Sequence, residues 1–281
     1  MQGTKQGYLL EDFRLFRLSG HGQGTFAPHY HDFCKILFFY KGEAEYLVEG
    51  RTYTLVPGDL VLVNQGEIHC PQVRENASYE RALLYLSPAF LEKYSNPDAL
   101  DSCFQIARHR HSNVIRLPKE QREHLFELIG RVERELSWKP QNRAFGAQTL
   151  ARAFVLEFLV ELNRAVTAGE ASYLHSGTMD FRVSELIAYI GSHLEDELSI
   201  ATLSKECHLS PYHMMRLFKE ETGCTIADYI TKKRLGLARG LLLSGQAKAT
   251  QACYQAGFSS YSSFFRAYKK EFGQSPKRAG Q

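Results

Sequence analysis

The sequence predicts an α+β protein of several domains, in which an N-terminal antiparallel β-barrel and two helices precede an all-helical C-terminal domain. Residues 13–86 have the short alternating runs of β-strands, and from residue 87 onward the clear patterns have the period of helices. The length of 281 residues and an apolar content of 44% suffice for two packed cores. A repeated unit in the last quarter of the chain is the third indication.

Turn residues divide the predicted strands. The runs on either side of Glu49 and Gly50 form a hairpin, because glycine accepts the positive φ that such a turn needs. A Pro-Gly-Asp turn at 57–59 precedes the strand at 60–63, and residues 79–86 supply one more strand. Short strands at this spacing indicate a sandwich or a barrel.

The helices after the barrel begin with a clear capping signal. Ser87 is suited to the N-cap and Pro88 to the first helical position. Residues 119–136 and 143–166 each carry one apolar stripe and predict two amphipathic helices. These stripes could cover the barrel, or one of them could face a second subunit in a coiled coil, and the sequence leaves both interpretations open.

The predicted domain boundaries follow from these patterns. The polar, glycine-containing stretch at 169–178 is the best linker in the chain. We therefore assign 1–110 to the barrel, 111–168 to the helical pair, which is the candidate dimerisation element, 169–179 to the linker and 180–281 to the helical domain.

Composition excludes several classes of protein. The six cysteines are scattered without a CxxC pair, as expected of reduced and mostly buried thiols, so neither a disulfide scaffold nor a zinc finger is indicated. The N-terminus lacks a signal-peptide pattern and the apolar runs are too short to cross a bilayer. We expect a soluble, cytoplasmic protein with no membrane partner.

Charge is distributed unevenly along the chain. Residues 198–281 carry 13 Lys and Arg against 5 Asp and Glu, whereas residues 1–197 carry 21 against 26. The basic end is therefore suited to a polyanion such as double-stranded DNA.

The last quarter contains one supersecondary unit twice. Residues 200–223 align with 250–273 without a gap, and the identical pairs are Ser210 with Ser260, Arg216 with Arg266, Lys219 with Lys269, Glu221 with Glu271 and Gly223 with Gly273. Each copy predicts a helix, a tight turn and a second helix, which the serine caps at its start and the glycine at its end. A long helix at 225–243 would hold the two helix-turn-helix units apart.

The second helix of each copy presents residues suited to a DNA groove, where arginine grips guanine and helix N-termini meet phosphate. The candidate DNA-binding residues are Ser210, Tyr212, His213, Arg216, Lys219, Ser260, Tyr261, Ser262, Phe265, Arg266 and Lys269. Two helical hairpins with an ordinary charged surface would give a similar pattern. The gap-free repetition within a basic segment favours DNA.

The segment 257–277, GFSSYSSFFRAYKKEFGQSPK, resembles the signature of the AraC family of bacterial transcription regulators, and 209–223 resembles the family's first recognition helix. The resemblance implies two helix-turn-helix units. It also implies base contacts from Tyr212, Arg216, Tyr261, Ser262, Phe265 and Arg266. The chain departs from the family pattern after Ser-Pro-x-x, where members often have Tyr-Arg.

Residues 20–86 resemble the cupin-type sensor barrel that many family members carry. Metal-binding cupins have an H-x-H pair, a Glu three or four residues later, and a G-x5-P-x-G-x2-H segment. Here His29 and His31 form the pair, and the segment from Gly58 to His69 has Asn64 in place of Pro. Lys35 stands in one of the Glu positions.

Lys35 decides how the histidines are interpreted. On a strand it shares a face with His29 and His31, and an ammonium group competes with a metal dication. We therefore expect no metal and no cofactor. We expect instead a site for a sugar or an organic acid, formed by His29, His31, Lys35, Tyr46 and His69. A structural role remains open, with Lys35 paired to Glu43, Glu45 or Glu80.

The leading hypothesis is a ligand-responsive, sequence-specific DNA-binding transcription regulator of carbohydrate or small-metabolite genes, and not an enzyme. A homodimer is expected, and RNA polymerase is a candidate partner. Two alternatives are a metal-dependent cupin enzyme fused to a DNA-binding module and a constitutive DNA-binding protein whose barrel only dimerises.

Overall fold

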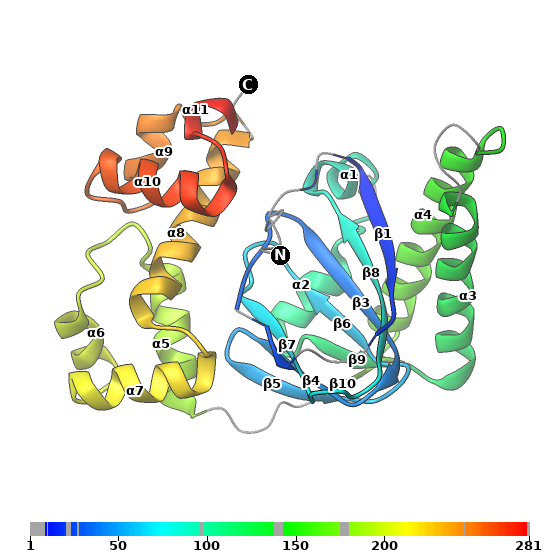
Figure 1. Ribbon diagram of the computed structural model, residues 1–281, viewed down its shortest axis with the longest axis horizontal. Coiled ribbons are helices and arrows are strands. Elements are labelled where there is room, and N and C mark those ends of the chain that lie inside the picture. The colour runs from blue at the N-terminus through cyan, green and yellow to red at the C-terminus, as the bar shows by residue number, and fades with distance from the viewer. Residues whose placement is uncertain are drawn as a thin grey trace.

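The computed structural model describes residues 9, 11–20, 24–26, 28–95, 98–137, 143–174, 180–243 and 245–279. A β-domain lies between two groups of helices (Figure 1). Helices α3 (Lys119–Leu136) and α4 (Ala147–Thr167) lie on one side of it, and the C-terminal helices lie on the other.

The β-domain consists of two antiparallel sheets, as the alternating sequence pattern predicts. The six-stranded sheet has the order β1 (Phe13–Leu18), β8 (Tyr79–Leu86), β3 (Cys34–Gly42), β6 (Leu60–Val63), β9 (Val114–Arg116) and β10 (Ser172–Tyr173). The four-stranded sheet has the order β2 (Gly24–Thr25), β7 (His69–Val73), β4 (Ala44–Val48) and β5 (Arg51–Leu55). The predicted hairpin joins β4 to β5 with positive φ at Glu49 and Gly50.

Alternation along β3 divides the β-domain into two cores. Leu37 and Phe39 belong to a cluster with residues of the four-stranded sheet, such as Tyr46. Ile36 and Phe38 belong to a second cluster with the helices on the other face. Because both faces of the six-stranded sheet are covered, its central strand β6 is apolar throughout.

Helices α1 (Pro88–Lys93), α2 (Ser102–His109), α3 and α4 pack with the outer face of the six-stranded sheet. Ser87 caps α1 as predicted, since its Oγ accepts a hydrogen bond from the Phe90 N–H at 3.1 Å. The apolar stripes of α3 and α4 are buried in this core, so they cover the barrel. The division predicted at residue 110 falls inside the sheet, because β9 and β10 both belong to it.

The C-terminal module comprises seven described helices. Their bounds are α5 (Phe181–Ser192), α6 (Ile200–Glu206), α7 (Pro211–Thr222), α8 (Ile226–Leu243), α9 (Ala249–Gln255), α10 (Tyr261–Phe272) and α11 (Pro276–Ala279). The predicted linker, residues 169–179, contains β10. Its residues 175–179 lie outside the described part of the chain. Among the described helices, none is both long and apolar enough to cross a membrane.

Both copies of the repeat have the predicted caps. Ser210 and Ser260 have extended backbones and accept hydrogen bonds from the N–H groups of His213 and Ser263. Gly223 and Gly273 end α7 and α10 in the left-handed conformation. All six cysteines are buried and free, as expected.

Gly257, in the second helix-turn-helix turn, is expected to tolerate no side chain. Its φ is +84° and a Cβ would lie 2.0 Å from the Leu194 carbonyl oxygen. Gly257→Ala should therefore add overpacking of about 1–3 kcal/mol to a backbone strain of about 1–2 kcal/mol. Gly273→Ala is the matched control, because Gly273 also has positive φ but no neighbouring atom within 4 Å of a Cβ. Urea unfolding measures both variants, and equal losses would contradict this packing.

Candidate ligand site and DNA interface

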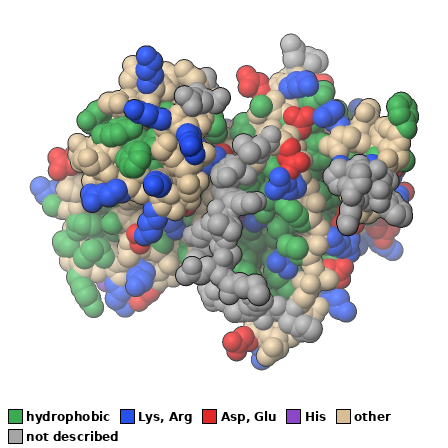
Figure 2. All heavy atoms as spheres, turned by 45° about the horizontal axis from the view of Figure 1, so that its top comes forward, with side chains coloured by type: hydrophobic (Ala, Val, Ile, Leu, Met, Phe, Trp, Pro, Cys, Tyr) green, Lys and Arg blue, Asp and Glu red, His purple; other side chains and the backbone are tan. Residues whose placement is uncertain are grey.

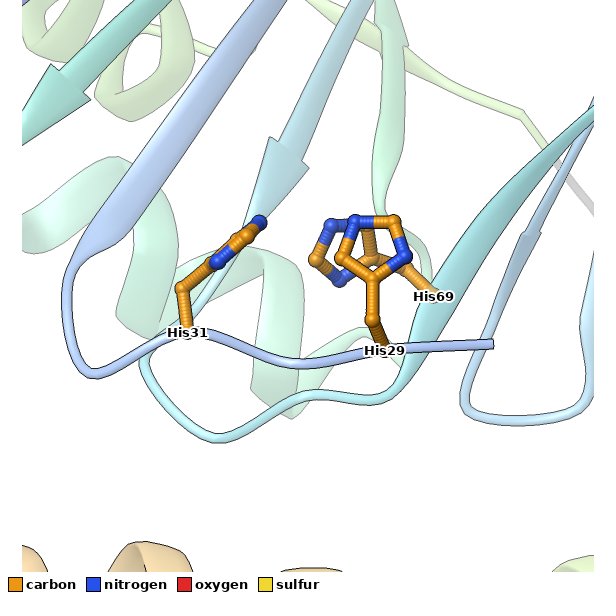
Figure 3. A group of neighbouring side chains, drawn as sticks. All are labelled: His29, His31 and His69. Atoms are coloured by element: carbon orange, nitrogen blue, oxygen red, sulfur yellow. The ribbon is translucent and has the colours of Figure 1, made fainter. Parts of the chain in front are cut away.

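Three histidine side chains meet where the segment before β3 pairs in antiparallel fashion with the start of β7. The His29 N–H donates to the His69 carbonyl at 3.0 Å, and the His69 N–H donates to the His29 carbonyl at 2.8 Å. One ring nitrogen of each of His29, His31 and His69 lies within 4.8 Å of the others. Figure 3 shows the rings of His29 and His31 rising from one segment toward the ring of His69 on its neighbour.

Lys35 and Tyr46 complete the predicted set beneath the histidines. Lys35 Nζ donates to Tyr46 Oη at 2.8 Å and lies 3.2 Å from His69 Nε2. His69 Nδ1 lies 2.9 Å from the Glu67 carbonyl oxygen, which only accepts, so this nitrogen carries the hydrogen and Nε2 has the lone pair. The structure therefore places Lys35 in contact with Tyr46 and His69, and the His69 ring lies beside the rings of His29 and His31.

Burial controls the charge of this cluster. Lys35, Tyr46 and His69 are each at most 4% exposed. Burial, with a smaller contribution from Arg81, lowers the pKa of Lys35 to about 7. Burial and the nearby Lys35 also lower the pKa of His69 well below its ordinary value. The cluster therefore offers nitrogen donors and lone pairs, and burial suppresses the positive charge of Lys35 and His69.

The buried carboxylate of Glu67 organises the loop that leads to His69. It accepts hydrogen bonds from the Asn64 N–H at 2.8 Å, from Asn64 Nδ2 at 3.0 Å and from Asn113 Nδ2 at 2.9 Å. Asn64, which replaces the proline of the resembling pattern, therefore closes this loop through its own side chain.

The alternative prediction for Lys35 was a structural ion pair with Glu43, Glu45 or Glu80. Lys35 instead contacts Tyr46 and His69, while Glu80 pairs with Arg17 at 2.6 Å. Tyr40 packs against Phe126 of α3, in the core on the other face of the sheet.

The segment that carries His29 and His31 also contacts the C-terminal module. Tyr30 and Asp32, which alternate with the histidines, point to α8. The Tyr30 ring belongs to the core of the C-terminal module, where it lies 6.4 Å from the Phe272 ring. Asp32 Oδ2 pairs with Arg239 Nε at 2.8 Å, with both side chains less than 10% exposed. Burial raises the pKa of Asp32 to about 6, against the attraction of Arg239.

Glu49, at the tip of the β4–β5 hairpin, makes a second contact with α8. Its carboxylate accepts hydrogen bonds from Tyr229 Oη and, at 2.6 Å, from Lys233 Nζ. The neighbouring Lys232 Nζ donates to the Pro28 carbonyl at 2.8 Å. Together with the Asp32–Arg239 pair, these bonds hold α8 against the sensor domain.

Sequence reasoning missed these interdomain residues. One signal was present: Arg239 stands in the apolar stretch LGLARGLLL at 235–243, where it shares a helical stripe with Leu235 and Leu242. An arginine on a buried stripe requires a partner. Nothing local in the sequence identified Asp32 as that partner.

A cavity of about 760 Å³ opens beside this contact. Its lining from the sensor domain includes His31, Asp32 and Gln65, and its lining from α8 includes Lys233, Gly236 and Leu237. His31 therefore borders both the histidine cluster and a space large enough for a small molecule.

The predicted DNA-binding residues occupy the second helix of each repeat. Met214, Phe218, Phe264 and Tyr268 form the buried side of α7 and α10. The exposed predicted residues are Ser210, Tyr212, Arg216, Lys219, Ser262, Arg266 and Lys269, and the half-buried ones are His213, Ser260, Tyr261 and Phe265. Lys and Arg side chains gather on the lobe formed by this module, at the left of Figure 2.

Four of the basic residues counted in the C-terminal segment face protein. Lys232, Lys233 and Arg239 contact the sensor domain, and Arg234 donates to the Leu194 carbonyl at 2.9 Å. The charge excess of the segment therefore overstates the charge that α7 and α10 present to DNA.

Comparison with known proteins agrees with both halves of this architecture. The family model for the AraC-like ligand-binding domain matches residues 12–159, and a helix-turn-helix domain model matches residues 203–281. The HTH-type transcriptional activator RhaS of Escherichia fergusonii is 24% identical over 261 residues, covering 92% of this chain and 89% of the relative. RhaS of Klebsiella pneumoniae is 24% identical over 266 residues, covering 91% and 87%.

A solved structure, ToxT from Vibrio cholerae, covers 95% of this chain and 97% of its own, with 14% identity and a TM-score of 0.39. With a ligand-binding domain and a helix-turn-helix domain in one chain, the protein is a ligand-responsive, DNA-binding transcription regulator. It belongs to the AraC family.

The two arginines that align in the repeat are expected to read bases. Arg216→Ala and Arg266→Ala should each cost about 1–3 kcal/mol of DNA-binding free energy and relax base preference, because a bidentate contact is lost. Lys219→Ala should weaken binding equally on all sequences. Gel-shift titrations against a set of single-base operator variants test this. Equal losses on every variant would assign the arginines to phosphate.

The salt dependence of DNA binding should be weaker than the charge of the segment suggests, because four basic residues of α8 contact protein rather than DNA. Eight neutralised phosphates would give a slope of log affinity against log salt near about −7, and withdrawing four basic side chains reduces it to about −4. Lys219→Met should lower the slope by about 0.9, and the control Lys232→Met should leave it unchanged. A wild-type slope near about −6 would mean that α8 leaves the sensor domain on DNA, because that release frees Lys232, Lys233 and Arg239.

Proposed function

We propose that this regulator is a transcription activator that responds to a sugar or an organic acid and controls carbohydrate or small-metabolite genes. The alternation of residues 29–32 carries the proposal: His29 and His31 face the candidate ligand cluster, while Tyr30 and Asp32 face the helix that joins both DNA-binding units. The RhaS relatives are transcriptional activators, which supports activation as the direction of the response.

The chemistry of the cluster favours an effector with several oxygen atoms. Its five side chains offer imidazole nitrogens, an amine and a phenol, and none of the five is a carboxylate. Hydroxyl and carboxylate oxygens are the complementary partners of such groups. The adjoining cavity gives the effector room beside His31.

The effector would act through the position of α8. A ligand that draws His29 or His31 toward itself displaces the intervening Tyr30 and the following Asp32. Because these residues bind α8, the docked and released arrangements would have different ligand affinity, as a two-state switch requires. Both recognition helices would then change their position relative to the sensor domain.

We further propose a homodimer in the cytoplasm, with RNA polymerase as the partner in activation. The start of α4 supports an interface there, because Phe145 is fully exposed and Leu150 is 46% exposed although both are apolar. This surface lies on the side of the β-domain away from the C-terminal module (Figure 1).

Screening followed by DNA selection tests the proposed function. Sugars and organic acids are screened for those that raise the unfolding temperature of the full chain, and genomic fragments bound with and without each such compound are then sequenced. A regulator should retain different fragments, or the same fragments with different affinity. Stabilising compounds that leave DNA binding unchanged would instead support a constitutive DNA-binding protein.

Asp32→Asn should uncouple the effector from DNA. The variant keeps the shape of the side chain but removes its charge, so Arg239 loses its ion-pair partner and the docked arrangement is weakened. We expect DNA affinity that no longer changes with the effector, measured by fluorescence anisotropy.

The control for this variant is Asp12→Asn. Asp12 pairs with Arg152 at 2.9 Å on the sensor domain, and both side chains are about one-third exposed. This substitution should leave the effector response intact. If Asp32→Asn retained the full response, the coupling route through α8 would be wrong.

A further inference from the structure

We propose that His29, His31 and His69 bind a divalent transition-metal ion, and that the effector of the proposed function is held through an open coordination position of that ion. The second half of this inference rests on the proposed function, whereas the first half is independent of it. Lys35 in place of a carboxylate disfavours a metal, whereas the observed geometry of the three histidines favours one.

The distances between the ring nitrogens suit a metal ion. The three ligand atoms lie within 4.8 Å of one another. Ligands at about 2.0–2.1 Å from a tetrahedral ion are separated by roughly 3.4 Å, so the rings need to close by little more than about 1 Å. The rings already converge on a common space (Figure 3).

The surroundings of the histidines hold two of the three rings in place. The paired backbones of His29 and His69 fix the two segments against each other. The His31 ring stacks on Phe33, with centroids 4.5 Å apart and planes 10° apart. The bond from His69 Nδ1 to the Glu67 carbonyl leaves Nε2 as the coordinating atom, which is the usual arrangement behind a metal-binding histidine.

The identity of the ligands selects the class of ion. Three imidazoles without a carboxylate favour borderline ions such as Zn²⁺, Ni²⁺ and Co²⁺ over Mg²⁺ and Ca²⁺, which prefer oxygen. Three protein ligands also leave a coordination position open. His31 also lines the adjoining cavity, from which a hydroxyl or carboxylate oxygen of the effector would approach that position.

Lys35 is the competitor of the ion. Its Nζ lies 3.2 Å from His69 Nε2, the lone pair that the ion needs. When an ion binds, Lys35 must give up this contact and retain its hydrogen bond to Tyr46. The competition predicts that removing the amine strengthens metal binding, whereas a purely structural histidine cluster predicts no such gain.

Titration of the metal-stripped full chain with Co²⁺ and Zn²⁺, followed by visible absorption and calorimetry, tests the site. We expect one ion per chain. His31→Ala should lower the affinity by more than about 100-fold, since loss of a partner behind a ligand alone costs about 10- to 100-fold. His124→Ala is the control, because His124 is exposed on α3, and it should change nothing.

Lys35→Met keeps the test valid if a histidine variant fails to fold. It should bind Co²⁺ about 10-fold more tightly than the wild type, because the competing amine is absent. Absence of saturable binding in both wild type and Lys35→Met would overturn the metal site. Stoichiometric binding that survives His31→Ala would also overturn it, by placing the ion elsewhere.

The link to the effector has a separate readout. A stabilising sugar or organic acid should lose its effect on DNA binding when a chelator is present and regain it on addition of Zn²⁺. A response that persists in chelator would overturn the metal-mediated link and leave the proposed function intact. A bound ion combined with no DNA response to any stabilising compound would contradict the proposed function and leave the metal site intact.

Discussion

The buried ion pair between Asp32 and Arg239 determines how the rest of the molecule is arranged. Arg239 is 1% exposed on a helix that is otherwise apolar at this end, so its charge requires a partner. Removal of one member of such a pair typically costs about 3–5 kcal/mol, because the other charge stays buried. The pair therefore fixes the register of α8 on the sensor domain more strictly than apolar contacts would.

Docking of α8 has consequences for both DNA-binding units. This helix runs between the two repeats and packs with α9, α10 and α11 as well as with α7. Once Tyr229, Lys233 and Arg239 are bound to the sensor domain, the positions of α7 and α10 relative to it are determined. A change of one or two side-chain contacts at the sensor surface is thereby converted into a change in the position of both recognition helices.

Features specified by local sequence could be predicted, and features that depend on distant partners could not. The caps at Ser210 and Ser260, the glycine ends of α7 and α10 and the hairpin at Glu49 were predicted because each depends on a few adjacent residues. The boundary at residue 110 divides a sheet, because Val114 and Ile115 of β9 pair with β6 about fifty positions earlier.

The candidate site shows the same division. The period of two along a strand predicted that Lys35 shares a face with His29 and His31, whereas β3 begins only at Cys34 and the histidine that Lys35 contacts is His69. Tyr46 and His69 were predicted to share a site with Lys35, but their direct contacts with its amine were not predicted because they lie on other strands. The basic residues of α8 were counted toward DNA because charge along a sequence does not reveal which cations already have a protein partner.

Lys35 also explains how a site can be assembled before any ligand arrives. Three imidazoles around a common space would repel one another if protonated, and burial alone does not orient their lone pairs. The amine of Lys35 donates toward His69 and also hydrogen-bonds to Tyr46, so the cluster already contains an amine that any ligand must displace. Such an exchange releases one contact as it forms another, which moves side chains without exposing the core. Because Tyr30 and Asp32 alternate with the histidines that take part, the exchange occurs on the segment that holds α8, and the ligand site and the DNA-binding units are coupled through four consecutive residues.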